Sequence, residues 1–304
     1  MTGPNIILDC DPGLDDAFAI FTAVEHTNVV GITSVAGNVG IDFTTRNALL
    51  VLEAAGAEVP VYRGAAGPLT GPTVEAAHVH GATGLGDLDR EPATEIAGDD
   101  AVGFILDAAE STNDLWLVAV GPLTNIAEAV QRRSDLVDQV AGLTIMGGAA
   151  RGGNSTPAAE FNIYADPEAA HVVFEAGFDL TMIGLDVTQQ VRMGHSQMAQ
   201  LEAADAPRSR LAAALLDFYG RSRIEARDTG DGAMHHPCAV LVITHPELFS
   251  CTDRHVAVET AGTLTRGMTV VDERLESRVA PNCRVGYGVD AAEVIDLIMG
   301  AATR

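Results

Sequence analysis

Four aspartates stand within eight residues near the amino terminus, in the run DCDPGLDD that begins at Asp9 and ends at Asp16. Like charges a few ångströms apart resist joint ionisation, so a positive group is expected beside them. Carboxylate oxygens at this density favour a hard cation, Ca²⁺ or Mg²⁺, over zinc. The structural alternative is that aspartates at the start of a helix cap it, which would explain one of the four but not the whole cluster. The run therefore predicts a cation site.

The residues around this run predict the elements that position it. Apolar runs alternate with amphipathic stretches, in the rhythm of a mostly parallel α/β sheet. Strands are expected over residues 6–10, 29–35, 59–62, 115–120, 142–146 and 180–183, and helices over 15–25, 44–55, 125–131 and 167–176. A largely helical part is expected over 196–244, then short strands around 254–271 and a closing helix over 291–299. We expect one α/β domain over residues 1–304, with a mostly parallel central sheet flanked by helices and a largely helical C-terminal part.

Polar motifs follow three of the expected strands. They are the aspartate run, Asn38, and the segment from Gly121 to Thr124. Because ligands in parallel sheets lie beyond the carboxyl ends of the strands, we expect the motifs to meet in one crevice. The segments 64–100 and 151–161 are rich in Gly, Pro, Thr and Asn, so they are expected to form long loops over it.

The composition excludes several classes of function. A formal net charge of −24, with a pI near 4.5, disfavours a nucleic-acid polymer as partner, because the chain would repel its phosphates. The chain holds no lysine, which excludes a Walker A site, a Schiff-base lysine and pyridoxal phosphate attachment. Its apolar runs are much shorter than the roughly 20 residues that span a bilayer, so no membrane partner is expected.

The amino terminus and the cysteines indicate a reducing compartment. No basic region precedes the first apolar segment, so no secretory signal is visible and the cytoplasm is the expected location. The four cysteines lack paired spacing and are expected to be reduced packing residues.

Two enzyme classes place such carboxylates after a first strand. Phosphatases of the haloacid dehalogenase type use a DxD pair but also need a lysine, which this chain lacks. The whole run ILDCDPGLDD instead closely resembles the inosine/uridine-preferring nucleoside hydrolase family. Further matches follow in family order over most of the chain: VAGN (35–38), HG and GLG (80–86), VGPLTN (120–125), MGG (146–148), Asn154, EFN and DPEA (160–169), and His235 with PCA (237–239). The resemblance implies a Rossmann-like fold and hydrolysis of the N-glycosidic bond of ribonucleosides to base and ribose.

The resemblance also implies roles for the polar residues. The reaction passes through an oxocarbenium-like sugar, so the site needs an activated water and carboxylates that stabilise positive charge. Asp11 would be both a Ca²⁺ ligand and the general base for the attacking water. Asp16 would be a second ligand, and Thr124 would offer its backbone carbonyl. The positions that surround the metal or bind the ribose hydroxyls are matched by Asp15, Asn38, Asn154, Glu160 and Asn162. Glu160 and Asn162 would point the same way if their segment is extended.

Other matches lie toward the leaving base. His235 corresponds to a histidine that faces the base in family members, and a histidine can donate a proton near neutral pH. His80 lies in a loop whose family counterpart also approaches the base, so which of the two protonates it stays open. Met146, Phe161 and Tyr219 could offer apolar surface to the base, although such residues are also common in cores.

The main departure from the family is His236, which stands where the family has an aspartate that completes the calcium shell. Neutral imidazole is a poor ligand for a hard cation, so this change would weaken Ca²⁺ binding, favour a softer metal, or let water replace the ligand. Asp231 could compensate only if its loop bends back. We expect an altered but functional metal site. The alternative is a nucleoside-binding protein that has lost catalysis.

Base preference and assembly are less determined. Arg221, Arg223 and Arg227 stand where some pyrimidine-preferring relatives have tyrosines and a glutamine, which disfavours a strict pyrimidine enzyme. Relatives form homodimers or homotetramers, so the resemblance implies a homo-oligomer here, with a small ribonucleoside as the binding partner.

Overall fold

The structure is a computed structural model that describes residues 3–225, 231–274 and 278–304. Within these residues the main sheet has eight strands, in the spatial order β3-β2-β1-β4-β5-β6-β12-β9. The strands in that order are β3 (Val61–Arg63), β2 (Asn28–Ser34), β1 (Asn5–Cys10), β4 (Leu115–Ala119), β5 (Gly142–Met146), β6 (Leu180–Ile183), β12 (Cys283–Val289) and β9 (Phe249–Arg254). All neighbours pair in parallel except β12 and β9, so the sheet is mostly parallel, as predicted.

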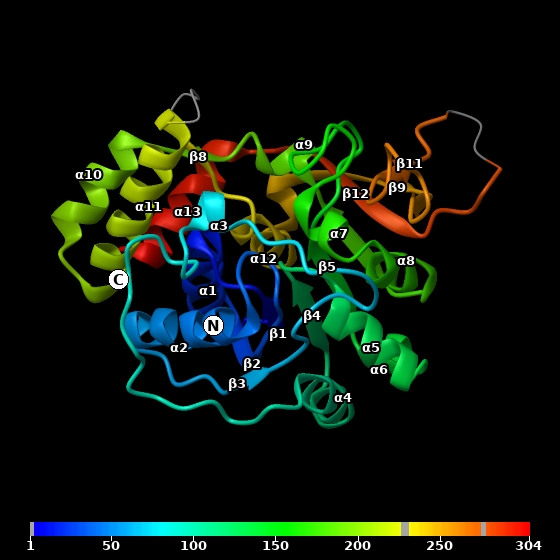
Figure 1. Ribbon diagram of the computed structural model, residues 1–304, viewed down its shortest axis with the longest axis horizontal. Coiled ribbons are helices and arrows are strands. Elements are labelled where there is room, and N and C mark those ends of the chain that lie inside the picture. Colours follow the sequence, from blue (N-terminus) through cyan, green and yellow to red (C-terminus); the bar gives the residue numbers. More distant parts are fainter. Residues whose placement is uncertain (1–2, 226–230, 275–277) are drawn as a thin grey trace.

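Two short strand pairs and a set of helices complete the described chain (Figure 1). The antiparallel pairs are β10 (Val256–Val258) with β11 (Thr269–Val271), and β7 (Arg192–Met193) with β8 (Gly232–Ala233). The helices up to β6 are α1 (Leu14–His26), α2 (Ile41–Ala55), α3 (Ala77–His80), α4 (Ala101–Ser111), α5 (Thr124–Arg132), α6 (Leu136–Gln139), α7 (Phe161–Ala165) and α8 (Pro167–Glu175). Those after it are α9 (Leu185–Thr188), α10 (His195–Ala204), α11 (Pro207–Glu225), α12 (Pro237–Thr244), the 3-10 turn η1 (Pro246–Leu248) and α13 (Ala291–Ala302).

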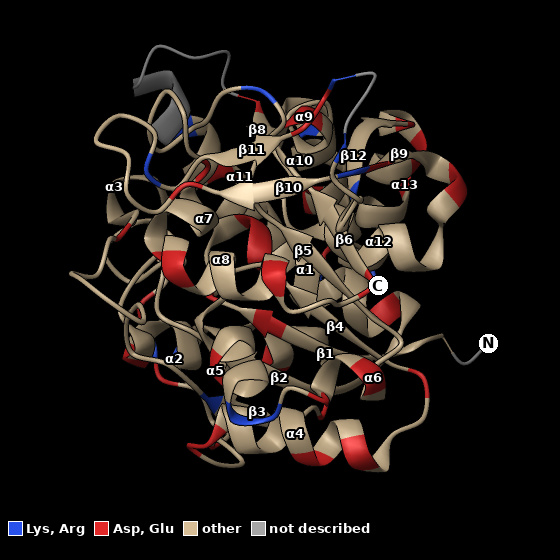
Figure 2. Cartoon of the chain, turned by 90° about the vertical axis from the view of Figure 1, so that its right-hand side faces the viewer, with Lys and Arg blue, Asp and Glu red and all other residues tan. Residues whose placement is uncertain are grey.

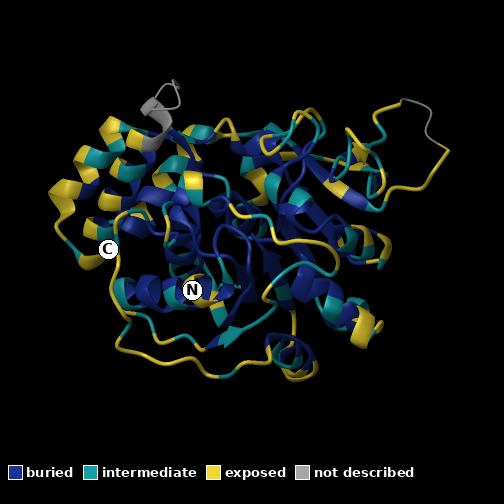
Figure 3. Cartoon of the chain, in the orientation of Figure 1, coloured by how far each residue is buried: buried dark blue, intermediate teal, exposed yellow. Residues whose placement is uncertain are grey.

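The sheet is buried on both faces because its side chains alternate between two apolar clusters. In β1, Ile6 and Leu8 belong to the cluster under α1, α2 and α11 to α13, whereas Ile7 belongs to the one under α4, α5 and α8. Figure 3 shows the sheet and its inner helix faces as buried, and the outer turns of α10 as exposed. Acidic positions are more frequent than arginines along the cartoon in Figure 2, as the count of 42 acidic against 18 basic residues requires.

The strand order decides where a ligand can bind. The chain moves outward from β1 to β3 on one side and from β4 to β6 on the other, so β1 and β4 flank the point where the order reverses. In doubly wound sheets the crevice beyond the carboxyl ends at this point is the usual binding site. The aspartate run follows β1 and the Gly121–Thr124 segment follows β4, so both expected motifs lie there.

The predicted strands and helices of the first two thirds are confirmed to within a few residues. Sequence reasoning missed α4 and β12, and it assigned β9 only in part. The 64–100 segment is a long loop that holds the single short helix α3 and an isolated bridge, from Tyr62 to Gly98, within its described structure. No helix in the described residues is both long and apolar enough to cross a membrane.

Candidate active site

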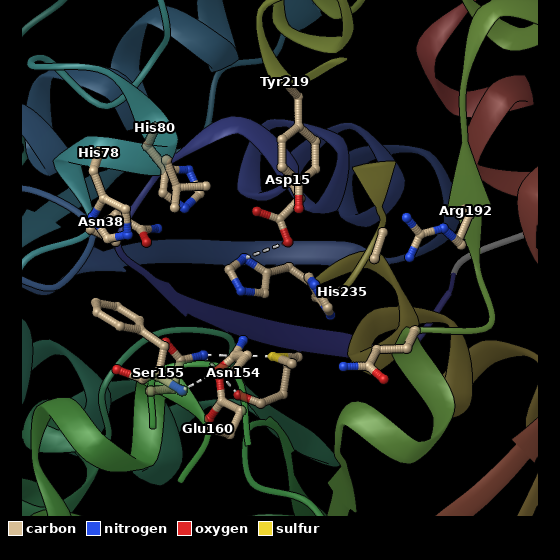
Figure 4. Close-up of a pocket in the computed structure, with 18 residues that line it drawn as sticks. Asp15, Asn38, His78, His80, Asn154, Ser155, Glu160, Arg192, Tyr219 and His235 are labelled. Atoms are coloured by element: carbon tan, nitrogen blue, oxygen red, sulfur yellow. Dashed lines mark hydrogen bonds and ion pairs between the residues drawn. The ribbon is translucent and has the colours of Figure 1, made fainter. Parts of the chain in front are cut away.

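A cavity of about 330 Å³ lies at the carboxyl ends of the central strands. Figure 4 shows its side chains converging from separate elements, with Asp15 and His235 near the centre. Of the residues predicted for the site, those that line it are Asp15, Asn38, His80, Met146, Asn154, Glu160, Phe161, Asn162, His235 and His236, together with Tyr219. Asp11, Asp16 and Thr124 are outside the lining and are almost completely buried.

Asp11 sits where the ends of three strands meet. Its Oδ2 accepts a hydrogen bond from the backbone N–H of Asn38 at 2.6 Å. A Cβ added at Gly37 would stand 2.1 Å from one carboxylate oxygen, and one at Gly121 would stand 2.7 Å from the other. Glycine is therefore required at both positions so that the backbone can approach this carboxylate.

One oxygen of Asp16 accepts hydrogen bonds at the start of α1, and the other has no hydrogen-bond partner within the described structure. Its Oδ2 accepts the backbone N–H of Gly13 at 2.9 Å, in the first turn of α1, and the side-chain amide of Asn38 at 3.3 Å. The same amide nitrogen donates to the carbonyl of Asp11 at 3.0 Å, so Asn38 joins the two segments. The capping alternative is thus correct for one oxygen of Asp16.

Asp9 is turned away from this group. Its Oδ1 accepts hydrogen bonds from Thr33 at 2.5 Å and Asn125 at 2.7 Å. Burial raises the pKa of Asp9 to about 7, against the effect of these two bonds. Asp9 therefore joins β1 to β2 and α5, and of the four aspartates it is the one with a mainly structural place.

The remaining aspartates offer oxygens to a cation. Asp11 Oδ1, Asp15 Oδ2 and Asp16 Oδ1 are buried and have no hydrogen-bond partner within the described structure. Buried ionised oxygens are costly unless a positive group compensates them. Asp15, Asp16 and His236 each present one ligand atom, and these atoms lie within 4.8 Å of one another. The donors fit a divalent metal ion, with Asp15 added to the predicted ligands and Asp11 outside this closest group.

His236 supplies positive charge to the cluster. Its Nδ1 lies 3.0 Å from Asp16 Oδ2 and 3.7 Å from Asp15 Oδ2. Burial would lower the pKa of His236, but the two carboxylates outweigh it and raise the pKa to about 10. Burial, reinforced by the charge of Asp16, raises the pKa of Asp11 well above its ordinary value. The aspartate run predicts a neighbouring positive group, and the imidazolium of His236 is one.

Thr124 lies at the start of α5, directly after the Gly121 turn. Its hydroxyl donates to Asp166 Oδ2 at 2.7 Å, and that oxygen also accepts the backbone N–H of Leu69 at 2.8 Å. Asp166 caps α8 as well, through the N–H of Ala169 at 3.0 Å. The hydroxyl is thus a structural anchor, and the predicted role of the Thr124 carbonyl as a ligand stays a prediction.

The segment with Glu160 and Asn162 is helical at its end, so the extended conformation considered for it is wrong. Glu160 is the N-cap of α7 and accepts the N–H of Ile163 at 3.2 Å and of Gly148 at 2.9 Å. Asn162 lies in the first turn and donates to the carbonyls of Val120 at 3.1 Å and Met146 at 3.0 Å. Both side chains still reach the cavity, because the capping residue and the first turn face the strand ends. Burial raises the pKa of Glu160.

Two histidines are held in defined orientations. His80 Nδ1 accepts the backbone N–H of Leu14 at 3.0 Å, which leaves the other nitrogen, Nε2, as the protonated one in the neutral ring. Burial lowers the pKa of His80, against the charges of Asp15 and Asp16. His235 Nδ1 lies 2.7 Å from the Thr188 hydroxyl, at the end of α9. A neutral His80 and an anchored His235 therefore face one cavity.

Several lining residues were not found by sequence reasoning. They are Ala76, His78, Val79, Ser155, Gln189, Arg192 and Ala233. Gln189 and Arg192 follow α9, and Figure 4 shows the guanidinium of Arg192 extending from β7 toward the cavity. His78 was noticed without a role, two residues before His80. No local pattern marks the other residues, which come from the segment around α3, the loop before α7, the residue after α9, and the short strands β7 and β8.

Other residues considered from the sequence lie away from the cavity or outside the described residues. Asp231 lies against Gly194, where an added Cβ would stand 1.9 Å from its Oδ1, and Arg192 donates to its carbonyl at 2.6 Å. Asp231 is therefore not part of the ligand group. Arg221 is exposed and donates to Asp217 and Asp87. Arg227 and the side chain of Arg223 lie outside the described residues.

Comparison with known proteins decides the family. The profile of the family described as "Inosine-uridine preferring nucleoside hydrolase" matches residues 6–296. This chain belongs to that family. It is therefore a nucleoside hydrolase, an enzyme that cleaves N-glycosidic bonds, and the resemblance seen in the aspartate run is confirmed.

Individual nucleoside hydrolases agree over nearly the full length. The chain is 41% identical to a pyrimidine-specific ribonucleoside hydrolase, RihA, of Shewanella baltica, over 97% of this chain and 95% of that protein. It is 40% identical to the inosine-uridine preferring nucleoside hydrolase of Leishmania major, over 94% and 92%. Among solved structures, a purine-preferring ribonucleoside hydrolase from Gardnerella vaginalis matches with a TM-score of 0.89 and 32% identity, over 98% of both chains.

Proposed function

We propose that the cavity hydrolyses ribonucleosides with Asp11 as the general base. The observation that carries this proposal is the set of buried, unpartnered carboxylate oxygens of Asp11, Asp15 and Asp16 at the switch point of the sheet. Asp11 is completely buried, its Oδ1 has no hydrogen-bond partner among the described residues, and a positioned carboxylate can accept a proton from water. Asp11 takes a proton from the attacking water while the water oxygen bonds to the anomeric carbon and the N-glycosidic bond to the base breaks.

A divalent ion would be held by Asp11, Asp15, Asp16 and the carbonyl of Thr124, with His236 as a further donor. When bound, such an ion lowers the pKa of water and holds ribose hydroxyls as a template. Ca²⁺ is the ion that the family resemblance implies for the carboxylates. The imidazole of His236 would add a nitrogen ligand to these oxygen ligands.

The ribose lies against the polar side of the cavity in this proposal. Asn38, Asn154 and Asn162 offer amide groups, and Asp15 and Glu160 offer carboxylates to its hydroxyls. Asn154 Oδ1 accepts the N–H of Phe161 at 2.9 Å, and Asn162 is fixed by two carbonyls, so these side chains need little reordering on binding. Negative charge near the ring stabilises the oxocarbenium-like transition state.

The leaving base lies against the other side, where Met146, Phe161 and Tyr219 offer apolar surface. His235 donates a proton to the departing base, while His80, neutral and bonded to Leu14, orients the base through Nε2. The assignment of the acid to His235 is supported by the hydroxyl of Thr188, which lies 2.7 Å from Nδ1 and fixes the orientation of the ring in the cavity.

A homodimer or homotetramer, as the family resemblance implies, and a cytoplasmic location, as expected from the sequence, complete the proposal. Light scattering coupled to size-exclusion chromatography tests the assembly.

The test of function is release of free ribose from inosine, uridine, adenosine and cytidine, after chelation and with added divalent ions. Ion-restored release supports the proposal and ranks the bases. If no nucleoside is cleaved with any ion while His236→Asp becomes active, the protein is a binding member of the family, and the catalytic proposal is wrong.

A further inference from the structure

His236 gives the metal site a donor that the carboxylates do not. Its ring is buried, and Nδ1 has no partner in hydrogen-bond geometry among the described residues, although Asp16 Oδ2 is only 3.0 Å away. The nitrogen is thus within ion-pair distance of that carboxylate oxygen. Asp15 Oδ2 and Asp16 Oδ1 are unpartnered as well. Three residues therefore bring buried ligand atoms into one small volume, where a metal ion would displace the proton that His236 shares with the carboxylates.

We propose that this site selects a first-row transition metal ion, of the class of Mn²⁺, Co²⁺ or Zn²⁺, over Ca²⁺. The inference rests on the proposed function in placing a catalytic cation here, and it deepens that function by naming the class of ion.

The donor atoms carry the argument. Ca²⁺ takes six to eight oxygen ligands and gains little from nitrogen. Imidazole suits the transition ions, whose affinity for a nitrogen site rises along the series from Mn²⁺ to Cu²⁺. Two carboxylates and one imidazole, as in Asp15, Asp16 and His236, form a mixed set that such ions accept and that leaves coordination positions for substrate.

The spacing is compatible with one shared ion. Two ligand atoms about 2.1 Å from an ion, at right angles to each other, are about 3 Å apart. The Nδ1 atom of His236 lies 3.0 Å and 3.7 Å from the nearest oxygens of Asp16 and Asp15. Only small side-chain movements would bring the atoms into one coordination shell.

Three other carboxylates form contacts elsewhere in the described structure and do not take the place of the missing aspartate. Asp231 lies against Gly194, and Asp9 is held by Thr33 and Asn125. Asp166 is engaged by Thr124 and by two backbone N–H groups. The imidazole therefore remains the donor at this position, and the oxygen count that Ca²⁺ prefers is lowered.

The experiment is equilibrium dialysis of the chelated full chain against Ca²⁺, Mn²⁺, Co²⁺ and Zn²⁺, with bound metal measured by mass spectrometry. The wild type is expected to bind one transition ion per chain at least about tenfold more tightly than Ca²⁺, a step typical of altered metal surroundings. His236→Asp restores an all-oxygen set and should reverse this order. The visible absorption of bound Co²⁺ should change in His236→Asn, which removes the nitrogen without adding charge.

His78→Gln is the matched control, because His78 lines the same cavity outside the ligand group. Its selectivity should equal that of the wild type; a loss as large as in His236→Asn would mean adventitious binding to pocket histidines and would overturn the inference. Tighter binding of Ca²⁺ than of every transition ion by the wild type also overturns it. So does stoichiometric binding of no ion, which would leave the imidazolium of His236 as the cation of the site.

Ribose release measured on the same samples separates the two proposals. Transition-ion selectivity without hydrolysis would remove the catalytic proposal and leave the metal inference standing. If Ca²⁺ binds most tightly and supports hydrolysis best, the catalytic proposal stands and the metal inference is overturned.

Discussion

The floor of the cavity and one of its walls are built in different ways. The floor, defined as Asp11, Asp15, Asp16, Asn38 and Asn162, comes from the loops at strand ends and the first turns of helices, and it is almost completely buried. The wall, defined as Gln189, Arg192, Tyr219 and His235, comes from α11 and the segments beside α9, β7 and α12. Gln189 is exposed, and Arg192 and His235 are partly exposed.

In the proposed function, this difference separates the activation of water, on the floor, from the contacts with the leaving base, on the wall. The side chains of Asp11, Asn38 and Asn162 are held by hydrogen bonds with backbone groups, so the strand ends and their loops fix their orientation. Wall residues can change with less effect on the fold. The related hydrolases fit this view, since their names specify pyrimidine, inosine-uridine and purine preference although the fold is shared.

The strongest test of the floor is Asp11→Asn. Loss of the general base should lower kcat/KM by about 10³-fold, measured as ribose release. Removing a buried carboxylate beside Asp16 should at the same time raise the Tm of the chelated protein, because like-charge repulsion is relieved. Asp9→Asn is the matched control on the same segment and should stay active. Equal losses in both variants would contradict the separate places given to the two aspartates.

A test of the wall is His235→Ala. Without the proton donor, kcat for inosine should fall by about 10²-fold, the lower end of general acid catalysis. The p-nitrophenolate of a p-nitrophenyl riboside leaves without being protonated, so the hydrolysis of that substrate should fall much less. A similar loss for both substrates would show that His235 acts on the floor, and His80 would become the candidate acid.

The anchor of His235 gives a smaller effect. Thr188→Val removes the hydroxyl 2.7 Å from Nδ1 and should lower kcat about fivefold, corresponding to about 1 kcal/mol for one hydrogen bond. Thr188→Ser keeps the hydroxyl and should recover most of the activity. If Thr188→Ser loses as much activity as Thr188→Val, the hydroxyl alone does not explain the effect of Thr188, and the prediction is wrong.

The smallest expected effect concerns a histidine outside both regions. Burial lowers the pKa of His26, and the edge-on ring of His245, at a centroid distance of 5.5 Å, lowers it further. The unfolded chain then binds more protons than the folded one near its ordinary pKa of 6.5, so this histidine's contribution is lost as pH falls below that value.

His26→Gln should therefore reduce the fall in Tm between pH 7.5 and pH 5.5 while ribose release at neutral pH is unchanged. An unchanged slope of Tm against pH would show that His26 does not contribute to acid sensitivity.

Much of this molecule could be predicted from local sequence. The run from Asp9 to Asp16 specifies a strand, a turn and a helix start within eight residues, so the floor carboxylates follow from contiguous sequence. Asn38 and Thr124 could be added because parallel strands end at one edge. The strand β12 was missed because its Gly-containing sequence, CRVGYGV, lacks a continuous apolar run.

Only the tertiary structure decided the rest. Packing places Gln189 and Arg192 in the cavity beside Tyr219, whereas nothing in the sequence around Gln189 and Arg192 marks them. The helical turn at Asn162 depends on the cap by Glu160 and on carbonyls from two distant strands. The family resemblance implied that His236 stands in the place of an aspartate. That its nitrogen lies among the buried oxygens of Asp15 and Asp16 is a consequence of α12 packing on α1, a contact between residues more than 200 positions apart.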